Sequence, residues 1–369
     1  MKTAADVVSA DLDFITRSLE YEFSQMAGKR LLIVGGGGFL GYYLVQSALA
    51  WNRRGKTAPI TVVVFDNWAR GVPSWIERLR SSSFLTLRTH DVTQRLPADI
   101  GAFDYIIHAA SIASPIFYRQ FPIETMDANV NGLRHLLEFA LQLKYSQRSI
   151  DGFLFYSTSE IYGDPTPENV PTAESYRGNV SCTGPRACYD ESKRYGETLC
   201  VNFAQQHGLP IKIARPFNNY GPGLKITDRR VLPDYARDVL AGKDINMLSD
   251  GSPTRTFCYI SDAIIGYYKI LVRGRPGEAY NIGTPEPEIS MLELAERIVA
   301  LSRSIFGYTG RIVRQVSNDA NYLVDNPNRR CPIIDKARHE LDYNPKIELD
   351  DGLQRSLLWY SENRTAEDR

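Results

Sequence analysis

Tyr189 and Lys193 stand four positions apart in the segment CYDESKR, residues 188–194. On a helix, both side chains would leave the same face, one turn apart. A phenol with an ordinary pKa near ~10 is a poor base at neutral pH, whereas an adjacent ammonium group favours the phenolate and lowers that pKa. The pair could therefore take a proton from an alcohol while a hydride leaves. By itself, however, Tyr-x-x-x-Lys is commonplace and is more often a surface pair.

Polar residues follow a buried apolar run in the segment FLFYSTSEIYG, residues 153–163. Ser157, Thr158, Ser159 and Glu160 would lie at the carboxyl end of a strand, where parallel α/β sheets form their ligand crevice. A hydroxyl such as that of Thr158 can share the hydrogen bond to a substrate alcohol. These residues and the Tyr-Lys helix, which follows a Pro- and Gly-rich loop, are predicted to meet at one site.

The segment LLIVGGGGFLGYYLV has the order strand, glycine turn and helix start. Gly36, Gly38 and Gly41 match the pattern G-x-G-x-x-G, and Gly35 begins the related pattern G-x-x-G-x-x-G. Glycine permits the tight turn, the approach of the backbone to a pyrophosphate and the close packing of helix on sheet. Four consecutive glycines could also be a flexible turn, but the flanking strand and helix favour dinucleotide binding.

Asp66 ends the second apolar run, in VVVFDN, and can accept hydrogen bonds from an adenosine ribose. Its charge would repel a 2'-phosphate, so NAD is favoured over NADP although Arg70 lies nearby. Asp66 comes later than usual because residues 51–59 indicate a longer loop before the strand. Asp91, in HDV, could meet the adenine amino group at the end of the third strand, or could simply form a turn.

Short apolar runs alternate with helical patterns along most of the chain. This alternation predicts an α/β fold with a doubly wound parallel sheet, the Rossmann fold. The predicted strands are 30–34, 60–66, 85–92, 104–110, 152–158 and 211–215. The predicted helices are 39–51, 122–145, 188–207, 233–242, 261–273, 290–306 and 350–362.

Three regions are expected along the chain. Residues 1–28 form an N-terminal extension that contains an amphipathic helix over 7–26. Residues 29–215 form the NAD-binding Rossmann domain. Residues 216–369 form mainly a smaller C-terminal substrate-binding lobe, with some segments that return to the Rossmann domain.

The composition of the 369 residues excludes several classes of partner. Lys plus Arg equals Asp plus Glu at 43 each, so no global field would attract nucleic acid or an anionic membrane. No apolar run is as long as a membrane span, and the N-terminus does not match a signal peptide. The five cysteines show no CxxC spacing, which favours reduced thiols and a cytoplasmic protein. The histidines are scattered singly, so no metal site is expected.

Nine motifs carry a resemblance to a known family: GGGGFLG, FDN, HDV, HAASIASP, STSEIYGDP, GPRACYDESKR, ARPFNNYGP, TRTFCYISD and YNIG. The chain resembles the extended short-chain dehydrogenase/reductases that act on nucleotide sugars, and within that group the UDP-glucuronate decarboxylases. The motifs extend over about residues 30 to 360, and the block 152–222 is the most specific. The resemblance implies NAD as cofactor, a nucleotide sugar as substrate, and a homodimer through the helices near 122–145 and 188–207.

The resemblance also implies roles for individual residues. The catalytic residues would be Thr158, Glu160, Tyr189, Lys193 and Arg255. The cofactor would be held by Gly35, Gly38, Phe39, Leu40, Gly41, Asp66, Asn67, Asp91, Val92, Ala109, Tyr189 and Lys193. The substrate would be held by Ser114, Ser159, Asn218, Arg230, Arg255 and Arg330, with Arg230 and Arg330 as candidates for the diphosphate.

The implied chemistry agrees with these residue types. Oxidation of C4 of a glucuronosyl group gives a ketone β to the C6 carboxylate, so carbon dioxide can leave as electrons move into an enolate. The Tyr189 phenol and the Thr158 hydroxyl can stabilise that enolate. Protonation at C5 and return of the hydride would give UDP-xylose. Arg255 could hold the carboxylate, and Glu160 could position a proton or a water molecule.

Four other activities remain open. A nucleotide-sugar 4,6-dehydratase would carry Asp-Glu where this chain has Ser159-Glu160, and a serine is a poor general acid. A 4-epimerase would need neither Glu160 nor Arg255. The motifs barely distinguish an oxidative decarboxylase that releases NADH from an enzyme that re-uses it. A non-catalytic dinucleotide-sensing protein would be expected to have lost Tyr189 or Lys193. Departures from the decarboxylase pattern leave the nucleotide and the sugar open, and they lie at Ile116, Phe117, Arg177, Ser192 and Leu248.

Overall fold

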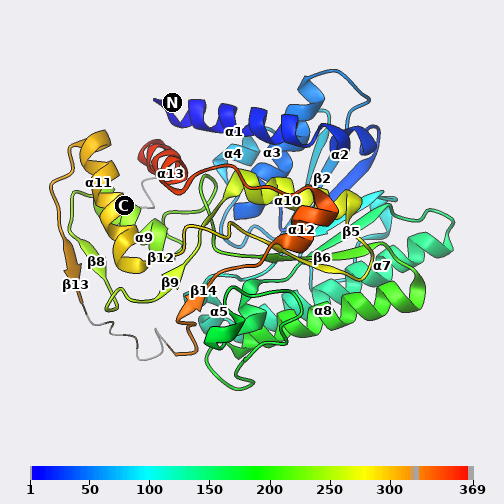
Figure 1. Cartoon of the computed structure of the whole chain (residues 1–369). Coiled ribbons are helices and arrows are strands. Elements are labelled where there is room, and N and C mark those ends of the chain that lie inside the picture. Colours follow the sequence, from blue (N-terminus) through cyan, green and yellow to red (C-terminus); the bar gives the residue numbers. More distant parts are fainter. Residues whose placement is uncertain (1, 316, 318, 320–323, 365–369) are drawn as a thin grey trace.

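The computed structural model describes residues 2–315, 317, 319 and 324–364. Within this part of the chain, seven parallel strands form one central sheet in the order β3-β2-β1-β4-β5-β6-β11 (Figure 1). Their bounds are β1 Arg30–Val34, β2 Thr61–Asp66, β3 Leu85–Thr89, β4 Tyr105–His108, β5 Gly152–Tyr156, β6 Ile211–Pro216 and β11 Ala279–Ile282. The strand order reverses beside β1, as in a Rossmann fold. The predicted doubly wound parallel sheet is confirmed.

The middle strands are continuous apolar runs because helices cover both faces of the sheet. Every residue of β4 and β5 is buried. In β1, Leu31 and Ile33 belong to one core and Leu32 and Val34 to the other, as the two-residue period of a strand requires. Three strands end before their predicted limits of 92, 110 and 158, although the next residue, His90, Ala109 or Ser157, still donates a backbone hydrogen bond to the neighbouring strand.

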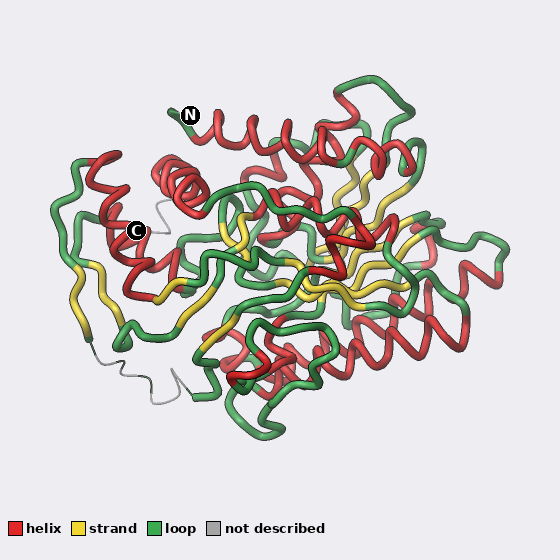
Figure 2. Tube along the Cα trace, in the orientation of Figure 1, coloured by secondary structure: helices red, strands yellow, loops and turns green. Residues whose placement is uncertain are grey.

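Each face of the sheet has its own helical layer (Figures 1 and 2). One face carries α3 Phe39–Arg53 and α10 Ile260–Arg273, and the other carries α7 Leu133–Tyr145 and α8 Ala187–His207. The helix predicted over 122–145 is divided into α6 Pro122–Asp127, a π-helical turn over Ala128–Gly132, and α7. The turn brings Asn129 against α8, where its side-chain nitrogen donates a hydrogen bond to Ser192 Oγ at 2.9 Å.

The N-terminal extension forms two helices, whereas the sequence predicted one over 7–26. α1 Ala4–Ser18 and α2 Glu20–Gln25 meet at Leu19, which leaves helical dihedral angles with φ −113° and ψ 23° and is fully buried. Figure 1 shows α1 along the outside of α3, and α1 also packs on α13 Leu349–Asn363. Asp11 anchors it, because its buried carboxylate accepts hydrogen bonds from Tyr43 and Tyr259 and pairs with Arg355.

The chain after residue 216 divides between a second lobe and the central sheet. α10 and β11 return to the sheet, while the lobe contains α9 and α11. The remaining elements of the described chain are α4 Ser74–Glu77, α5 Pro115–Gln120, β7 Asn219–Tyr220, α9 Val231–Leu240, β8 Ile245–Met247, β9 Thr254–Arg255, β10 Cys258–Tyr259, β12 Ile289–Ser290, α11 Met291–Phe306, β13 Ile312–Arg314, β14 Arg329–Arg330 and α12 Asp335–Leu341, with 3-10 turns at Ala98–Ile100, Ser159–Tyr162 and Pro167–Asn169. The predicted boundaries at 28 and 215 stay predictions.

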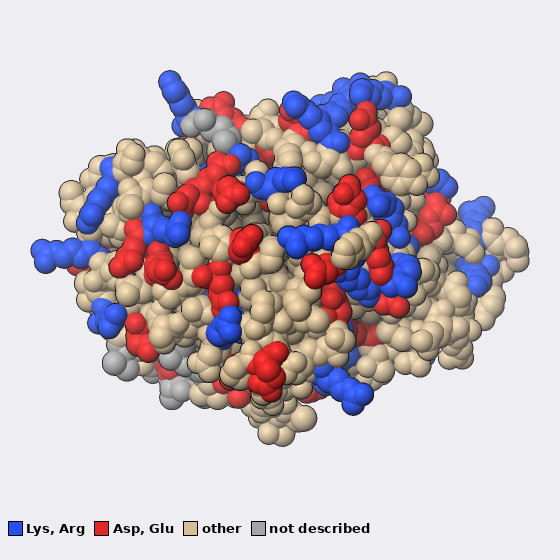
Figure 3. Space-filling view, in the orientation of Figure 1, with Lys and Arg blue, Asp and Glu red and all other residues tan. Residues whose placement is uncertain are grey.

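The surface carries charges of both signs. On the face shown in Figure 3, basic and acidic side chains are interspersed, without a broad patch of one sign. Among the helices of the described residues, none has the length and apolar character to cross a membrane.

Candidate active site

Tyr189 and Lys193 lie on the buried face of α8, and their side chains are not solvated. Tyr189 is 6% exposed and Lys193 is 2% exposed. The Lys193 ammonium group donates a hydrogen bond to the Tyr156 carbonyl at 2.7 Å and lies 5.8 Å from the centre of the Tyr189 ring. An ordinary surface pair is therefore excluded.

Burial governs the protonation of this pair. Loss of water raises the pKa of Tyr189 to about 12, although Thr158 and the positive charge of Arg230 oppose the shift. Burial also lowers the pKa of Lys193 to about 7. The sequence had led us to expect a lowered phenol pKa. The protein alone does not supply it, because Lys193 is bonded to the Tyr156 carbonyl and its own charge is disfavoured by burial.

Glu160 lies between two guanidinium groups. It belongs to the 3-10 turn that begins after β5, where Thr158 Oγ1 accepts a hydrogen bond from the Glu160 amide at 3.2 Å. Its two carboxylate oxygens form ion pairs with Arg186, which precedes α8, and with Arg330 of β14. Burial would raise the pKa of Glu160, but the charges of Arg186 and Arg330 outweigh it and lower the pKa to about 2. Glu160 is thus held as an anion at neutral pH.

Arg255 is close to this cluster but lacks a carboxylate partner among the described residues. Its guanidinium group donates to the carbonyls of Thr254 at 2.7 Å, Pro327 at 2.6 Å and Asn328 at 3.1 Å. Burial and the nearby Arg330 lower its pKa to about 10, so it remains charged at neutral pH. A positive charge that is bound only by neutral groups is suited to an incoming anion.

The other residues expected to contact the substrate fall into two groups. Ser159 and Arg330 lie beside Glu160, since Arg330 donates to Ser159 Oγ at 3.1 Å and is 3% exposed. Asn218 also belongs to this side of the site, where its side chain donates to the Thr256 carbonyl, next to Arg255, at 2.8 Å.

Ser114 and Arg230 form the second group, around the buried carboxylate of Asp228. Ser114 Oγ donates to the Asp228 carbonyl at 2.7 Å, and Arg230 pairs with the Asp228 side chain at 3.0 Å. Arg70, from the loop after β2, also pairs with Asp228 at 3.3 Å and lies over the Phe117 ring at 5.2 Å. The loop after β2 therefore contacts both the segment of Phe117 and the segment of Asp228.

The glycine loop leaves the amino-terminal end of α3 free of side chains. Gly38 is the N-cap of α3 and provides no side-chain cap, so the first amide groups remain available to an anion. Gly35 has φ 83°, and a Cβ atom there would lie 2.5 Å from the Ala110 amide nitrogen. Gly41 lies against the Gly36 carbonyl with no room for a side chain. The loop thus fits a dinucleotide pyrophosphate, with Phe39 and Leu40 in the first turn of the helix.

Asp66 occupies the end of β2 beside this loop. Its two oxygens accept hydrogen bonds from the amides of Gly37 and Trp68, both at 2.9 Å. Each carboxylate oxygen can accept a further hydrogen bond, so the position suits a ribose. Burial raises the pKa of Asp66, although these amides oppose the shift. The neighbouring Asn67 is exposed and accepts a hydrogen bond from Ala69.

The other residues expected to hold the cofactor, Asp91, Val92 and Ala109, lie just beyond the ends of β3 and β4. Asp91 is exposed, lies beyond the end of β3, and accepts hydrogen bonds from the amide and hydroxyl of Thr93. This is the turn that the sequence left open as the alternative. Val92 is buried against Gly132, and Ala109 directly follows β4, where its amide donates to the Val34 carbonyl.

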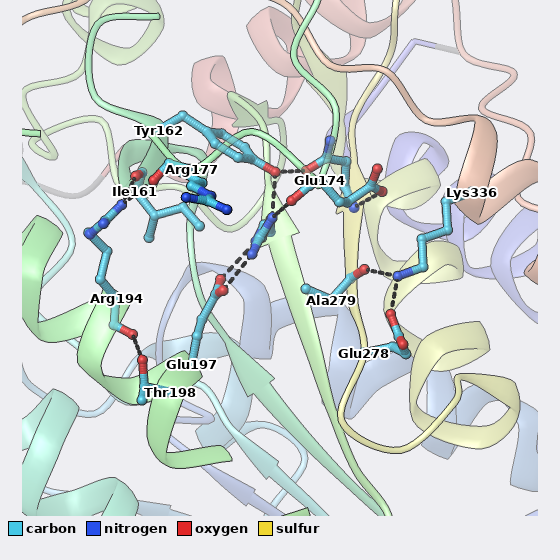
Figure 4. A network of polar contacts seen from close by, with 12 residues as sticks. Ile161, Tyr162, Glu174, Arg177, Arg194, Glu197, Thr198, Glu278, Ala279 and Lys336 are labelled. Atoms are coloured by element: carbon cyan, nitrogen blue, oxygen red, sulfur yellow. Dashed lines mark hydrogen bonds and ion pairs between the residues drawn. The ribbon is translucent and has the colours of Figure 1, made fainter. Parts of the chain in front are cut away.

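A polar network supports the segment that connects β5 to α8 (Figure 4). Arg215 of β6 forms two hydrogen bonds with Glu197 of α8, at 2.6 and 2.8 Å, and a third with the Tyr162 hydroxyl at 2.7 Å. Tyr162 in turn donates to Asn281 of β11 at 2.7 Å, and the Asn281 amide donates to Glu174. The turn that carries Glu160 is therefore joined to the sheet by side chains distant in the sequence.

Sequence reasoning missed three residues of this site. Arg186 lies inside a quoted motif, GPRACYDESKR, but its pairing with Glu160 could not be inferred. Asp190 follows Tyr189 and is 4% exposed. Tyr118 of α5 stacks on Tyr189, with ring centres 5.1 Å apart. The signal for the first two was a pair of opposite charges four residues apart, at the start of a helix with a buried face.

Comparison with known proteins agrees with this geometry. The chain is 37% identical to UDP-glucuronic acid decarboxylase 6 of Arabidopsis thaliana over 88% of its own length and 86% of the relative's. It is 35% identical to UDP-glucuronic acid decarboxylase 1 of Danio rerio over 92% and 74% of the two chains. The resemblance predicted from the motifs is confirmed.

Two solved structures share the fold at lower identity. The dTDP-glucose 4,6-dehydratase DesIV of Streptomyces venezuelae, with NAD bound, matches at TM-score 0.77 and 24% identity over 91% of this chain and 98% of that one. The UDP-glucuronic acid 4-epimerase of Bacillus cereus, in complex with UDP-glucuronic acid and NAD, matches at TM-score 0.74 and 24% identity over 90% and 99%. The model of the NAD dependent epimerase/dehydratase family matches residues 31–283, and the chain belongs to this family.

Proposed function

We propose that the protein is an NAD-dependent carboxy-lyase that converts UDP-glucuronate to UDP-xylose and carbon dioxide. The decarboxylase relatives support the reaction, and the site supports it independently. The observation that carries the proposal is Arg255, a partly buried guanidinium group that forms no ion pair with a carboxylate of the described residues. A uronic acid brings one carboxylate, which would balance this charge.

Tyr189 is assigned as the base that takes the proton of the C4 hydroxyl. Its buried phenol is neutral in the free protein, so a nearby positive charge is needed to form the phenolate. Thr158 shares the hydrogen bond to the same oxygen, and its own oxygen is fixed by the Glu160 amide. The Lys193 ammonium group lies 5.8 Å from the centre of the Tyr189 ring and is fixed there by its bond to the Tyr156 carbonyl.

The cofactor is assigned to the glycine loop and the end of β2. The amides at the start of α3 would bind the pyrophosphate, and Asp66 would bind the ribose. Asp91, Val92 and Ala109 would lie along the adenine and nicotinamide ends. NAD bound there would supply the hydride acceptor for C4 oxidation and, as NADH, the hydride for the final reduction. The positive nicotinamide ring is also the charge that would favour the Tyr189 phenolate.

Arg255 is assigned to the C6 carboxylate, and Ser159 and Asn218 to the sugar. Ser114 and Arg230 are assigned to the diphosphate, because they lie together around Asp228 and the Arg230 side chain is 33% exposed. Arg330 is 3% exposed and engaged by Glu160, Ser159 and Gly163. Its position therefore favours support of Glu160 over direct contact with the diphosphate, which the sequence had suggested.

Glu160 is assigned to decarboxylation as an anion. Because Arg186 and Arg330 hold its pKa at about 2, it cannot donate a proton at neutral pH. The same property disfavours a 4,6-dehydratase, in which an acid must protonate the departing C6 hydroxyl. The neighbouring Ser159 is not an acid either.

The test is incubation of the purified protein with UDP-glucuronate and NAD, with carbon dioxide, NADH and the sugar product measured together. Carbon dioxide, UDP-xylose and no net NADH are expected. Carbon dioxide with an equal amount of NADH would instead indicate the oxidative enzyme. Release of no carbon dioxide from any nucleotide uronic acid would refute the decarboxylase assignment.

We also propose that the protein is a homodimer through the helical layer formed by α6, α7 and α8. Apolar side chains are exposed on and beside these helices, and they are Ile116, Phe121, Ile123, Met126 and Tyr195. α6 packs against α8, so these residues belong to neighbouring surfaces. Burial of such side chains in a partner would stabilise the association.

A reducing compartment, the cytoplasm, is proposed from the cysteines. All five are free, and three of them are buried, at positions 200, 258 and 331. Titration with a thiol reagent should find five thiols after unfolding in protein prepared without reductant. Fewer than five would count against this compartment.

A further inference from the structure

One guanidinium group lies between two carboxyl groups beside the proposed base. Arg186 binds Glu160 on one side, and its Nε atom lies 3.6 Å from Asp190 Oδ2 on the other. Asp190 immediately follows Tyr189 on α8, and its side chain is 5% exposed. Asp190 has no part in the proposed binding of cofactor or substrate or in the oxidation at C4.

The two carboxyl groups differ in how readily they hold a proton near neutral pH. Glu160 faces Arg186 and Arg330, which keep it ionised. Burial and the negative charge of Glu160 raise the pKa of Asp190 to about 7, although Arg186 and Arg330 oppose the shift. Neighbouring titratable groups with separated pKa values are the arrangement by which enzymes divide acid and base roles.

Three buried polar atoms around Asp190 have no hydrogen-bond partner among the described residues. They are the Tyr118 hydroxyl, Asp190 Oδ1 and Arg186 Nε. Tyr118 comes from α5, so this group joins two elements at the back of the Tyr189 ring. Buried polar atoms of this kind are normally satisfied by water or by a ligand.

The proposed reaction needs a proton that the assigned residues do not supply. When carbon dioxide leaves, the electron pair of the C5–C6 bond moves into an enolate, and a new C5–H bond must form. Tyr189 is committed to the C4 oxygen, and Glu160 carries no proton. The donor must therefore be a third group that retains a proton near neutral pH.

We propose that Asp190 stores this proton and donates it through one water molecule to C5, and that the resulting carboxylate takes a proton back from solvent. The inference rests on the proposed function, and it balances without an oxidant or reductant. It assigns to Arg186 the role of a positioning residue that holds Glu160 as an anion, and the negative charge of Glu160, together with burial, keeps the proton on Asp190. The substrate reinforces this state, because its carboxylate brings negative charge toward Asp190.

The first test measures protons taken up on binding. Tyr189→Phe protein should not turn over substrate, so calorimetry in buffers of different ionisation enthalpy can follow binding alone at pH 7.5. UDP-glucuronate should draw a proton onto Asp190, whereas UDP-xylose, which lacks the carboxylate, should not. Equal uptake with the two ligands would overturn the inference.

The same measurement in the Tyr189→Phe/Asp190→Asn protein should show the glucuronate-specific uptake lost. Tyr189→Phe/Glu191→Gln is the matched control, since Glu191 lies on the same helix and instead faces Arg194 at 3.7 Å. The control should retain the uptake. Uptake that persists without Asp190 would assign the proton to another group and would overturn the inference.

The second test is turnover with Tyr189 intact. Asp190→Asn should lower kcat at least tenfold, leave KM within threefold, and accumulate bound NADH after carbon dioxide has been released. Asp190→Glu restores a carboxyl group and should recover part of kcat. An unchanged kcat in Asp190→Asn would overturn the role of Asp190 and leave the proposed function intact. Failure of the wild-type protein to release carbon dioxide refutes the proposed function instead, and the proton-uptake result then still decides whether Asp190 is the group that takes up the proton.

Discussion

Tyr118 and Tyr189 stack face to face, with ring centres 5.1 Å apart and an angle of 9° between the rings. Tyr118 comes from α5 and Tyr189 from α8, so the stack fixes the proposed base against a second element. The Arg186 guanidinium lies 5.9 Å from the centre of the Tyr118 ring. Tyr189 is thus oriented by the Tyr118 ring, and Tyr118 also contacts the Arg186 guanidinium group.

Replacement of Tyr118 should reduce the rate more than the affinity. Tyr118→Ala removes the stack, which is worth about 1 kcal/mol, and leaves Tyr189 free to rotate. We expect kcat to fall about tenfold and KM to change less than about threefold, because the lost contact orients the base and does not bind substrate. Tyr118→Phe keeps the ring and is the control. Equal losses in the two variants would assign the effect to the hydroxyl instead.

The buried ammonium of Lys193 should make stability depend on pH. Its pKa falls from 10.5 to about 7 on folding, so between these values the unfolded chain binds more protons than the folded one. Stability therefore rises with pH across this window, and the full cost of burying the charge is present below pH 7.

Lys193→Met should remove that cost. We expect the variant to gain melting temperature relative to the wild type at pH 6, and to gain less at pH 9.5, where the wild-type lysine is already neutral in the folded state. Expressed as free energy of unfolding, the gain at pH 6 should exceed the gain at pH 9.5 by an amount on the order of a few kcal/mol. Lys56→Met, at an exposed site, is the control. A gain that is independent of pH would contradict the prediction.

Local pattern was sufficient to predict six of the seven strands of the sheet, all but β11, and the residues that must lie on a particular face. The glycine loop, Asp66 at the end of β2 and the helical pair Tyr189 and Lys193 are encoded by short-range spacing. Periodicity indicates which face is buried because burial is the main determinant of these patterns. It also predicted the polar turn that carries Glu160.

Partners of buried charges could not be predicted in this way. Arg330 and Glu160 are 170 residues apart, and nothing in either segment specifies the other. The return of β11 to the edge of the sheet likewise depends on a crossing connection. Leu19 interrupts the N-terminal helix because tertiary packing outweighs helical propensity there.

Removal of the Arg255 charge should weaken binding of the uronic acid selectively. Arg255→Met is expected to raise the Kd of UDP-glucuronate about 100-fold, in line with about 2–5 kcal/mol for truncation of one partner of a buried charge pair. The Kd of UDP-xylose should change less than about threefold. Arg297→Met, on the outside of α11, is the control. Calorimetry with both ligands gives the comparison, and an equal loss for both would indicate that Arg255 binds the diphosphate.

Asp11 should be the main anchor of the N-terminal helix. Its fully buried carboxylate is shared by Tyr43, Tyr259 and Arg355, so Asp11→Ala leaves two buried hydroxyls without their acceptor and leaves Arg355 paired with Asp351 alone. We expect a loss of about 3 kcal/mol in the free energy of unfolding. Asp13→Ala is the control, because Asp13 forms half-exposed ion pairs and should cost less than about 1 kcal/mol. Urea denaturation of the two variants tests this directly, and equal losses would show that Asp11 is not special.

A charge on the proposed dimer surface should separate the protomers. Ile123 on α6 is 65% exposed, which makes it the most accessible of the large apolar side chains on this surface. Ile123→Glu would place an unpaired carboxylate in the interface, where the loss of hydration is not compensated. Light scattering should give a mass of twice 41.6 kDa for the wild type and 41.6 kDa for the variant. Tyr21→Glu changes an exposed aromatic residue on α2, outside this surface, and should remain dimeric. A wild-type protein that is monomeric at micromolar concentration would refute the proposed assembly, and a variant that stays dimeric would place the interface elsewhere.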